Sequence, residues 1–175
     1  NKKFLTYIGN RHEYKNASIL IEVLNNLNDF DLVYVGGETP SNEEIKMIKR
    51  YKLNSRINFL KASDQKLINI MKQSYAICIP SKMEGFSIPL IEALYLDIPV
   101  IASNIPVHKE IGGEFAYLLD PEKPKEWSKF IMKSELKPPS KILGIENYSL
   151  TKKYFSYERV AKEHLNVYKK LVNKI

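Results

Sequence analysis

The chain alternates short apolar runs with longer segments in which apolar residues recur at helical spacing. The short runs have the length and composition of β-strands and are bounded by glycine, proline or polar residues. They span residues 4–9, 31–37, 57–60, 75–80, 99–103 and 115–119. The longer segments predict helices over residues 17–27, 41–53, 64–74, 89–96, 107–112, 124–136 and 156–172. We expect Ser41 or Asn42, and Asp64, to cap two of these helices.

Strands that alternate with helices indicate an α/β domain with a mostly parallel six-stranded sheet. The strand-like runs are apolar throughout, as expected when helices cover both faces of the sheet. We therefore predict one domain over residues 1–175. The Pro-containing stretch 137–149 is expected to be a loop or crossing segment that can lead the last helix away from the sheet.

Composition and charge indicate which classes of protein this chain does not belong to and which ligands it favours. The 175 residues are 44% hydrophobic, which fits a single globular core, and the lone Cys78 excludes an internal disulfide. The sequence contains neither an apolar run long enough to span a bilayer nor a secretory signal pattern. The three histidines lack metal-ligand spacing, and the net charge of +7 favours anionic partners or ligands. Solvated lysines on helix faces also explain that charge.

The carboxyl ends of parallel strands meet at one edge of a sheet, and ligands of open α/β sheets bind beyond that edge. The residues that follow the first five predicted strands are therefore the place to look for a site. They are residues 9–15, 36–38, 61–64, 80–84 and 103–104. This edge gathers glycines, small polar residues, cations and Glu84.

Residues 80–94, PSKMEGFSIPLIEAL, carry the clearest chemistry. Pro89 fits the first turn of a helix, so free backbone N–H groups before and at its start would face an anion. These N–H groups belong to Gly85, Phe86, Ser87 and Ile88. One turn into the helix, the two oxygens of Glu92 could accept both hydroxyls of a ribose. Glu84 could accept hydroxyls of a second sugar across a diphosphate, so the segment predicts a nucleoside-diphosphate-sugar site.

The same segment resembles the E-x7-E signature of retaining GT-B glycosyltransferases, specifically the glycosyltransferase group 1 family (family 4). The run PSKMEGFSIPLIEALYLDIPVIASNIPVHKEIGG is similar to that family's consensus over its length. YIGNRHEYKN resembles the family's first strand and basic loop, and FSYERVAKEHLNVYKKL resembles its closing helix. The resemblance covers nearly the whole chain. It implies a Rossmann-like, three-layer α/β/α domain, the C-terminal, donor-binding half of a GT-B fold.

The resemblance also implies roles for individual residues. Glu92 would hold the ribose, Glu84 the donor sugar, and the N–H groups around Phe86 and Ser87 the distal phosphate. Gly9, Arg11 and Lys15 would form the basic loop, with Arg11 and Lys15 neutralising the diphosphate. Glu84, Arg11 and Lys15 would thus be the catalytic residues. The chain departs from the family pattern in two ways. Asn10 separates Gly9 from Arg11, and Ser87 and Asp97 stand where most members have glycine.

We expect neither a metal ion nor a cofactor. Asp29 and Asp31 form a D-x-D pattern, but they precede their strand, which puts them on the edge opposite the predicted site. Arg11, Lys15 and the helix N-terminus would instead stabilise charge that develops on the departing diphosphate.

The expected enzyme is a glycosyltransferase that moves a sugar from a UDP- or GDP-sugar to a glycan or a lipid-linked saccharide. The expected setting is biosynthesis of a bacterial surface polysaccharide (O-antigen, capsule or lipopolysaccharide) in the cytoplasm, with peripheral contact to an anionic membrane and no nucleic acid partner. A GT-B N-terminal domain would supply the acceptor site, and residues 151–175 would pack toward it. Two alternatives are a nucleotide-sugar 2-epimerase and a non-catalytic interaction module that uses its basic surface.

Overall fold

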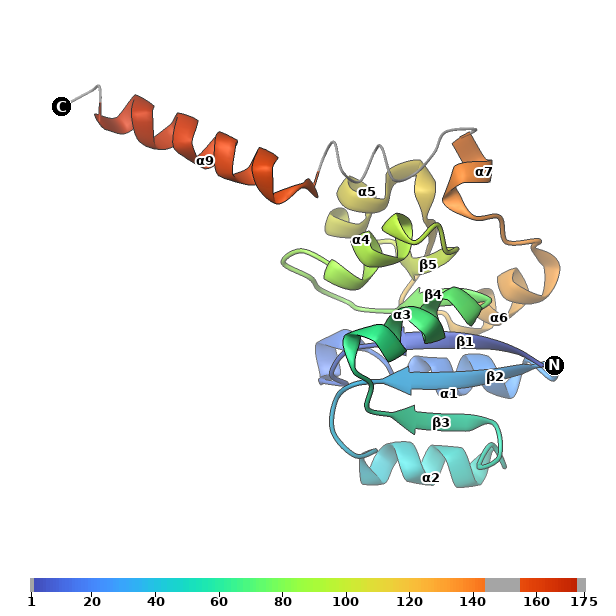
Figure 1. The fold of residues 1–175 in the computed structure, drawn as a ribbon. Helices are drawn as coiled ribbons and strands as arrows, with labels where there is room; N and C mark the ends of the chain where they lie inside the picture. Colours follow the sequence, from blue (N-terminus) through green and yellow to red (C-terminus); the bar gives the residue numbers. More distant parts are fainter. Residues whose placement is uncertain (1, 144–154, 173–175) are drawn as a thin grey trace.

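The computed structural model describes residues 2–143 and 155–172. Its centre is a six-stranded parallel sheet (Figure 1) with the strand order β3-β2-β1-β4-β5-β6. The strands are β1 Lys3–Ile8, β2 Phe30–Val35, β3 Ile57–Leu60, β4 Ala76–Ile79, β5 Val100–Ser103 and β6 Tyr117–Leu119. The prediction of an α/β domain with a parallel six-stranded sheet is confirmed. From β1, strands β2 and β3 are added on one side, and β4, β5 and β6 are added on the other. The strand order therefore reverses between β1 and β4, which are neighbours at the centre of the sheet.

Helices cover both faces of the sheet because each strand is apolar on both sides. Along β4, Ala76 and Cys78 face one buried cluster, whereas Ile77 and Ile79 face the other. The helices of the compact body are α1 Ile19–Asn25, α2 Asn42–Arg50, α3 Asp64–Gln73, α4 Ile88–Tyr95, α5 Pro106–Gly112, α6 Pro124–Lys133 and α7 Pro139–Leu143. Two short 3-10 helices, η1 Glu13–Lys15 and η2 Gly113–Phe115, follow β1 and α5. Trp127 of α6 is fully buried in the first cluster.

The last helix, α9 Tyr157–Val172, extends away from this body (Figure 1), and none of its residues is buried. Its apolar side chains lie mainly on one side of the helix, with Arg159, Lys162 and Lys170 on the other. In the part of the chain that the structure describes, no helix has the length and apolarity needed to cross a bilayer.

Local chemistry explains where the helices begin. Ser41 caps α2 in a capping box, in which its hydroxyl accepts from the Glu44 N–H and the Glu44 carboxylate accepts from the Ser41 N–H. Asp64 does not cap α3 as expected; it is the first helical residue, and Ser63 occupies the cap position. Helix α7 lies in the stretch predicted as a loop or crossing segment, and the rest of that stretch, beyond Leu143, lies outside the described residues.

Candidate functional site

The loop after β1 is fixed by close backbone packing and by one asparagine. Gly9 has φ 126, and a Cβ atom on Gly37 would lie 3.0 Å from the Gly9 carbonyl oxygen, so both positions favour glycine. Asn16, with φ 53, follows η1 as its C-cap residue. The Asn16 side-chain amide donates to the Pro80 carbonyl at 3.1 Å and to the Pro121 carbonyl at 2.7 Å. These bonds hold η1, and with it Lys15, against the loop that follows β4.

Lys15 and Glu84, which are 69 positions apart in the sequence, form a close ion pair at the carboxyl edge of the sheet. The Lys15 ammonium lies 2.8 Å from Oε1 and 2.7 Å from Oε2 of Glu84. The Ser81 hydroxyl donates to Oε1 of the same carboxylate at 2.7 Å. The side chains of Lys15 and Glu84 are only 22% and 9% exposed. The structure thus brings together two of the predicted site residues and holds the Glu84 carboxylate in a fixed orientation.

The start of α4 presents the second feature of the site. Ser87 occupies the cap position, and its backbone is extended (φ 163), so serine replaces glycine there without strain. The Ser87 hydroxyl is buried and has no hydrogen-bond partner among the described residues. Pro89 lies in the first turn, as predicted, while Gly85, Phe86 and Ile88 are exposed. An unpaired hydroxyl donor beside free helix N–H groups is suited to an anion.

Glu92 lies on the same helix and is exposed. The pKa of the Glu92 carboxyl is raised above its ordinary value of 4.5. The main cause is desolvation by the surrounding protein, and the smaller cause is repulsion from the Asp64 carboxylate. Both carboxylates line a groove of about 390 Å³ between α3, α4 and the start of α9. The rest of its lining is mostly apolar and includes Leu67, Ile91 and Phe155.

Arg11 is held by partners on α2 and on the loop after β2. Its guanidinium is paired with Glu44 at 3.0 Å (Nε to Oε1) and donates to the Gly36 carbonyl at 3.2 Å and to the Glu38 carbonyl. The side chain is 6% exposed and packs over the ring of Phe59 at 4.9 Å. These partners use the guanidinium to tie the loops after β1 and β2 to α2. The role of Arg11 toward a diphosphate beside Lys15 stays a prediction.

Three side chains around the site had no individual role in the sequence-based prediction. Ser81 holds Glu84, and the Pro-Ser dipeptide of the family-like run was an available signal. Asp64 lies close enough to Glu92 to repel its charge, whereas the sequence placed it at the site edge only as a helix cap. His108 is fully buried, with Nδ1 2.9 Å from the Ser103 carbonyl oxygen and Nε2 unpaired among the described residues. Burial lowers the pKa of His108, while the charge of nearby Glu84 opposes that shift; no pattern in the sequence marked this residue.

The D-x-D pattern lies where the sequence predicts it. Asp29 precedes β2 and Asp31 is its second residue, so both carboxylates are at the amino edge, away from Glu84. Among the described residues, no group of three or more His, Cys, Asp or Glu side chains is arranged to hold a metal ion.

Residues 1–167 match the family described as "Glycosyl transferases group 1". The chain is 33% identical over 121 residues to the O-antigen chain mannosyltransferase RfbU of Salmonella typhimurium, a match that covers 68% of this chain and 34% of RfbU. Its fold superposes with a TM-score of 0.82 on Anabaena Alr3699/HepE in complex with UDP-glucose, at 17% identity, over 97% of this chain and 49% of HepE. It superposes with a TM-score of 0.70 on the C-terminal domain of the group 1 family protein LpcC from Francisella tularensis, at 21% identity, over 89% of this chain and 87% of that domain. The chain spans less than half the length of the curated relatives that it matches.

Proposed function

Because the chain belongs to the family of group 1 glycosyl transferases, we propose that it is the donor-binding half of a retaining glycosyltransferase. The observation that carries this proposal is the juxtaposition of the Lys15–Glu84 pair with the start of α4, where the Ser87 hydroxyl is unpaired. A sugar diphosphate offers hydroxyls to the Glu84 carboxylate and phosphate oxygens to the helix N–H groups, the Ser87 hydroxyl and the Lys15 ammonium.

In this proposal each group has one task. Glu92 accepts the two ribose hydroxyls, and the N–H groups of Gly85 to Ile88 together with the Ser87 hydroxyl bind the distal phosphate. Glu84 accepts hydroxyls of the transferred sugar, oriented by Ser81. Gly9 lets the loop approach the ligand closely. Lys15 has a third N–H beyond the two that face Glu84, and it stabilises the charge that develops on the diphosphate as the sugar leaves.

The comparisons narrow the substrates that we propose. RfbU is named an O-antigen chain mannosyltransferase, and HepE is described in complex with UDP-glucose. We therefore propose a UDP- or GDP-linked hexose as donor and a glycan or lipid-linked saccharide as acceptor, in bacterial O-antigen or related surface-polysaccharide synthesis. The proposed reaction takes place in the cytoplasm at the inner face of the membrane. It requires no metal and no cofactor, since Lys15 and helix α4 provide the positive charge.

The acceptor site belongs, in this proposal, to a second domain outside the described chain. Helix α9 supports it, because its apolar side chains are exposed on a helix that projects from the body. Large apolar side chains at the rim of the site, Met83 and Phe86, are also exposed. We propose that the N-terminal domain covers both surfaces, so that the 175-residue chain alone binds donor but transfers little sugar.

A thermal-shift panel of UDP, GDP, ADP and their sugars tests the proposal. A ligand present at about 100 times its Kd stabilises the folded state by about 2.7 kcal/mol. For a domain of this size, that corresponds to a rise in Tm of roughly 5–10 °C. We expect one nucleotide series to give such a shift, and its sugar form to exceed the free diphosphate because Glu84 contacts only the sugar.

Glu92→Ala is expected to remove most of this shift, and Lys15→Met to reduce it. Asp29→Ala, at the opposite edge of the sheet, is the matched carboxylate control and should leave the shift intact. A shift that survives Glu92→Ala and Lys15→Met but disappears in Asp29→Ala would place the ligand at the other edge and refute the proposal.

A further inference from the structure

The side-chain charges at the carboxyl edge of the sheet do not balance those of a nucleotide sugar. Both phosphates of such a donor are ionised, but Lys15 is already paired with Glu84. Glu92 adds a further carboxylate to this edge, and the Arg11 guanidinium is paired with Glu44. A diphosphate that binds here therefore needs positive charge beyond that of Lys15 and the partial charge of the α4 N-terminus.

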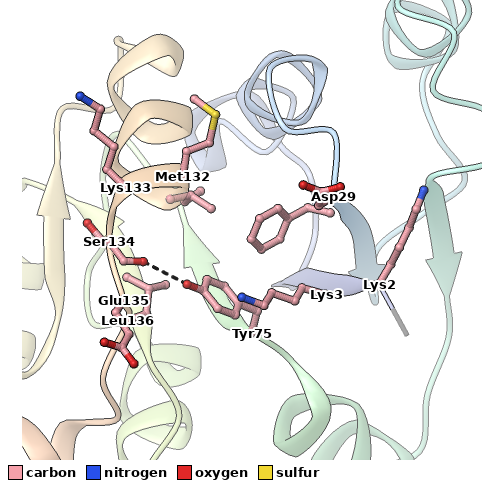
Figure 2. Close-up of a pocket in the computed structure, with 11 residues that line it drawn as sticks. Lys2, Lys3, Asp29, Tyr75, Met132, Lys133, Ser134, Glu135 and Leu136 are labelled. Atoms are coloured by element: carbon pink, nitrogen blue, oxygen red, sulfur yellow. Dashed lines mark hydrogen bonds between the residues drawn. The ribbon is translucent and has the colours of Figure 1, made fainter.

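The groove at the amino edge of the sheet differs in this respect (Figure 2). It has a volume of about 1040 Å³ and is lined by the amino ends of β1 and β2 and by the end of α6. Lys2 lies 4.0 Å from Asp31, and carboxylates line the groove beside its two other lysines. The Tyr75 hydroxyl on its wall donates to the Ser134 carbonyl. Charges are thus matched around this groove, in contrast to the carboxyl edge.

A buried imidazole lies beside the proposed donor site. His108 of α5 is fully buried, and its Nδ1 lies 2.9 Å from the Ser103 carbonyl oxygen at the end of β5. Since a carbonyl oxygen only accepts, Nδ1 carries the hydrogen, and Nε2 of the neutral ring is an acceptor. This Nε2 is buried and has no hydrogen-bond partner among the described residues. A buried polar atom without a partner calls for an explanation, and protonation is one that the surroundings of His108 favour.

Helix packing places His108 at the same end of the sheet as the start of α4. Helices α4 and α5 follow the neighbouring parallel strands β4 and β5, so both begin at the carboxyl edge. A Cβ atom on Gly112 would lie 3.4 Å from the Leu90 side chain, so the two helices touch there. Ser87 and His108 come one turn earlier on their helices, and the Ser87 hydroxyl is also buried and unpaired in the described part of the chain. Both groups thus lie where the phosphates are proposed to bind.

Charges on two other elements act on the His108 ring. Burial lowers its pKa from the ordinary value of 6.5, the hydrogen bond to the Ser103 carbonyl and the charge of Glu84 oppose this shift, and the charge of Lys15 adds to it. Glu92, the carboxylate of α4, lines the groove on the side of α3. The charged side chains of α5 and η2 are exposed, namely Lys109, Glu110 and Glu114. The ring is therefore largely uncharged at neutral pH, and negative charge brought near it favours the imidazolium form.

We propose that His108 takes up a proton from solvent on Nε2 when the diphosphate of a donor binds, and that the imidazolium supplies the positive charge that Lys15 lacks. This inference rests on the proposed function, because it needs a diphosphate at the start of α4. Nδ1 keeps its bond to the Ser103 carbonyl in both states, so protonation changes the charge of the ring without moving it. Because the ring is fully buried, it acts on the donor through its charge and not by contact, as a positioning residue.

Calorimetric titration in two buffers measures this proton. The chain is titrated at pH 6.5 with UDP-glucose and with GDP-mannose, in MES and in imidazole buffer, which differ in ionisation enthalpy. The difference in binding heat gives the number of protons taken up. We expect at least about 0.3 proton per donor bound. Glu92 acts in the opposite sense, because a donor favours its ionised form, and comparison between variants removes that contribution.

Replacement of His108 by asparagine separates its charge from its shape. His108→Asn keeps an N–H for the Ser103 carbonyl but takes no proton near neutral pH. Proton uptake should fall below about 0.1 per donor. Since a raised pKa in the complex helps binding only below that pKa, affinity should be about threefold weaker at pH 6.5 but within about 1.5-fold at pH 8. A purely structural role would weaken binding equally at both pH values.

The matched control is His12→Asn, the same change at an exposed histidine in the loop after β1. It should keep both the proton uptake and its pH dependence. A second readout retains His108 itself. The double variant His12→Asn with His164→Asn leaves His108 as the only histidine, and its ring ¹⁵N shifts report the charge. We expect donor binding to raise the pKa of this ring by about one unit or more.

The outcomes separate this inference from the proposed function. Donor binding with no buffer dependence would overturn the inference and leave the donor site in place. So would proton uptake that survives His108→Asn but disappears in His12→Asn, or a His108 ring that stays neutral at pH 6.5 in the donor-saturated chain. If neither nucleotide sugar gives binding heat or a thermal shift, the proposed function and this inference are both refuted.

Discussion

The Lys15 ammonium neutralises Glu84, so each charge of the pair is balanced within the domain. If a donor binds here as proposed, it competes with this ion pair for each charge, while the Ser81 hydroxyl keeps the Glu84 carboxylate in place. Because the carboxylate is already held in one orientation, it loses little conformational entropy when a ligand binds. The entropic cost of binding sugar hydroxyls is therefore small.

The raised pKa of Glu92 predicts a pH-dependent affinity for donor. A carboxylate accepts from both ribose hydroxyls, but a protonated carboxyl loses part of that capacity, so affinity should fall as pH drops through the raised pKa. Asp64→Asn removes one cause of the rise and should move the fall to lower pH. Isothermal titration between pH 8 and 5 with UDP-glucose or GDP-mannose, whichever stabilises the chain, checks this. Neither sugar has a terminal phosphate that titrates there, and a fall displaced to higher pH in Asp64→Asn would contradict the explanation.

The sequence predicted the position of a site residue where that residue directly follows a strand or precedes a helix. Glu84 follows a strand and Ser87 precedes a helix-starting proline, so their edge of the sheet followed from the sequence. The partners of Arg11 could not be predicted from local pattern, because they are Glu44, 33 positions later, and the carbonyls of another loop. A long flexible side chain can choose between two such partners, and only the three-dimensional arrangement decides between them.

At the scale of elements, helix α2 depends on one carboxylate with two tasks. Glu44 completes the capping box and pairs with buried Arg11. Glu44→Ala should destabilise the chain by about 3–5 kcal/mol, because it removes the ion-pair partner of a buried guanidinium and the carboxylate half of the capping box. The control is Glu43→Ala, an exposed acid in the same turn, which should cost less than about 1 kcal/mol. Urea denaturation measures both changes, and equal losses would show that the ion pair contributes nothing.

Strands and helices were the most predictable elements, since each strand is a continuous apolar run and each major helix has clear periodicity. Helix α7 was missed because Pro138 and Pro139 suggested a loop, although proline is well tolerated at a helix start. Its stability comes partly from a distant residue, because Asp97 accepts from the Ser140 N–H at 2.8 Å and from the Ser140 hydroxyl at 2.6 Å. Such a long-range cap leaves no local pattern in the sequence.

At the scale of the whole molecule, α9 should contribute little to the stability of the isolated chain. Leu165 and Leu171 are 55% and 58% exposed, so Leu165→Asp with Leu171→Asp should shift the Tm by less than about 2 °C. The control, Leu94→Asp on α4, buries a charge at a position that is 4% exposed and should unfold the domain. Circular dichroism melting compares them, and a large loss in the α9 variant would mean that the helix folds onto the body.

The sequence predicted the site at the carboxyl edge of the sheet but not the groove at the amino edge. The carboxyl edge was found because ligand-binding loops follow strands in order. The amino-edge groove combines Lys3, Tyr75 and Lys133, which come from three separate elements and belong to no motif. Its existence depends on side-chain packing at the junction of β1 with α6, which periodicity does not encode.

Pairing of β1 with β4 sets the order in which the nascent polypeptide becomes functional. Leu5 pairs with Ala76, so the central seam cannot close until the ribosome has released both strands. Closing that long loop costs entropy, which makes this encounter a slow step compared with the growth of local helices. Lys15 and Glu84 lie just beyond the two strands of the same seam. The event that unites the two halves of the sheet therefore also creates the ion pair, and no shorter, partly folded intermediate can display it.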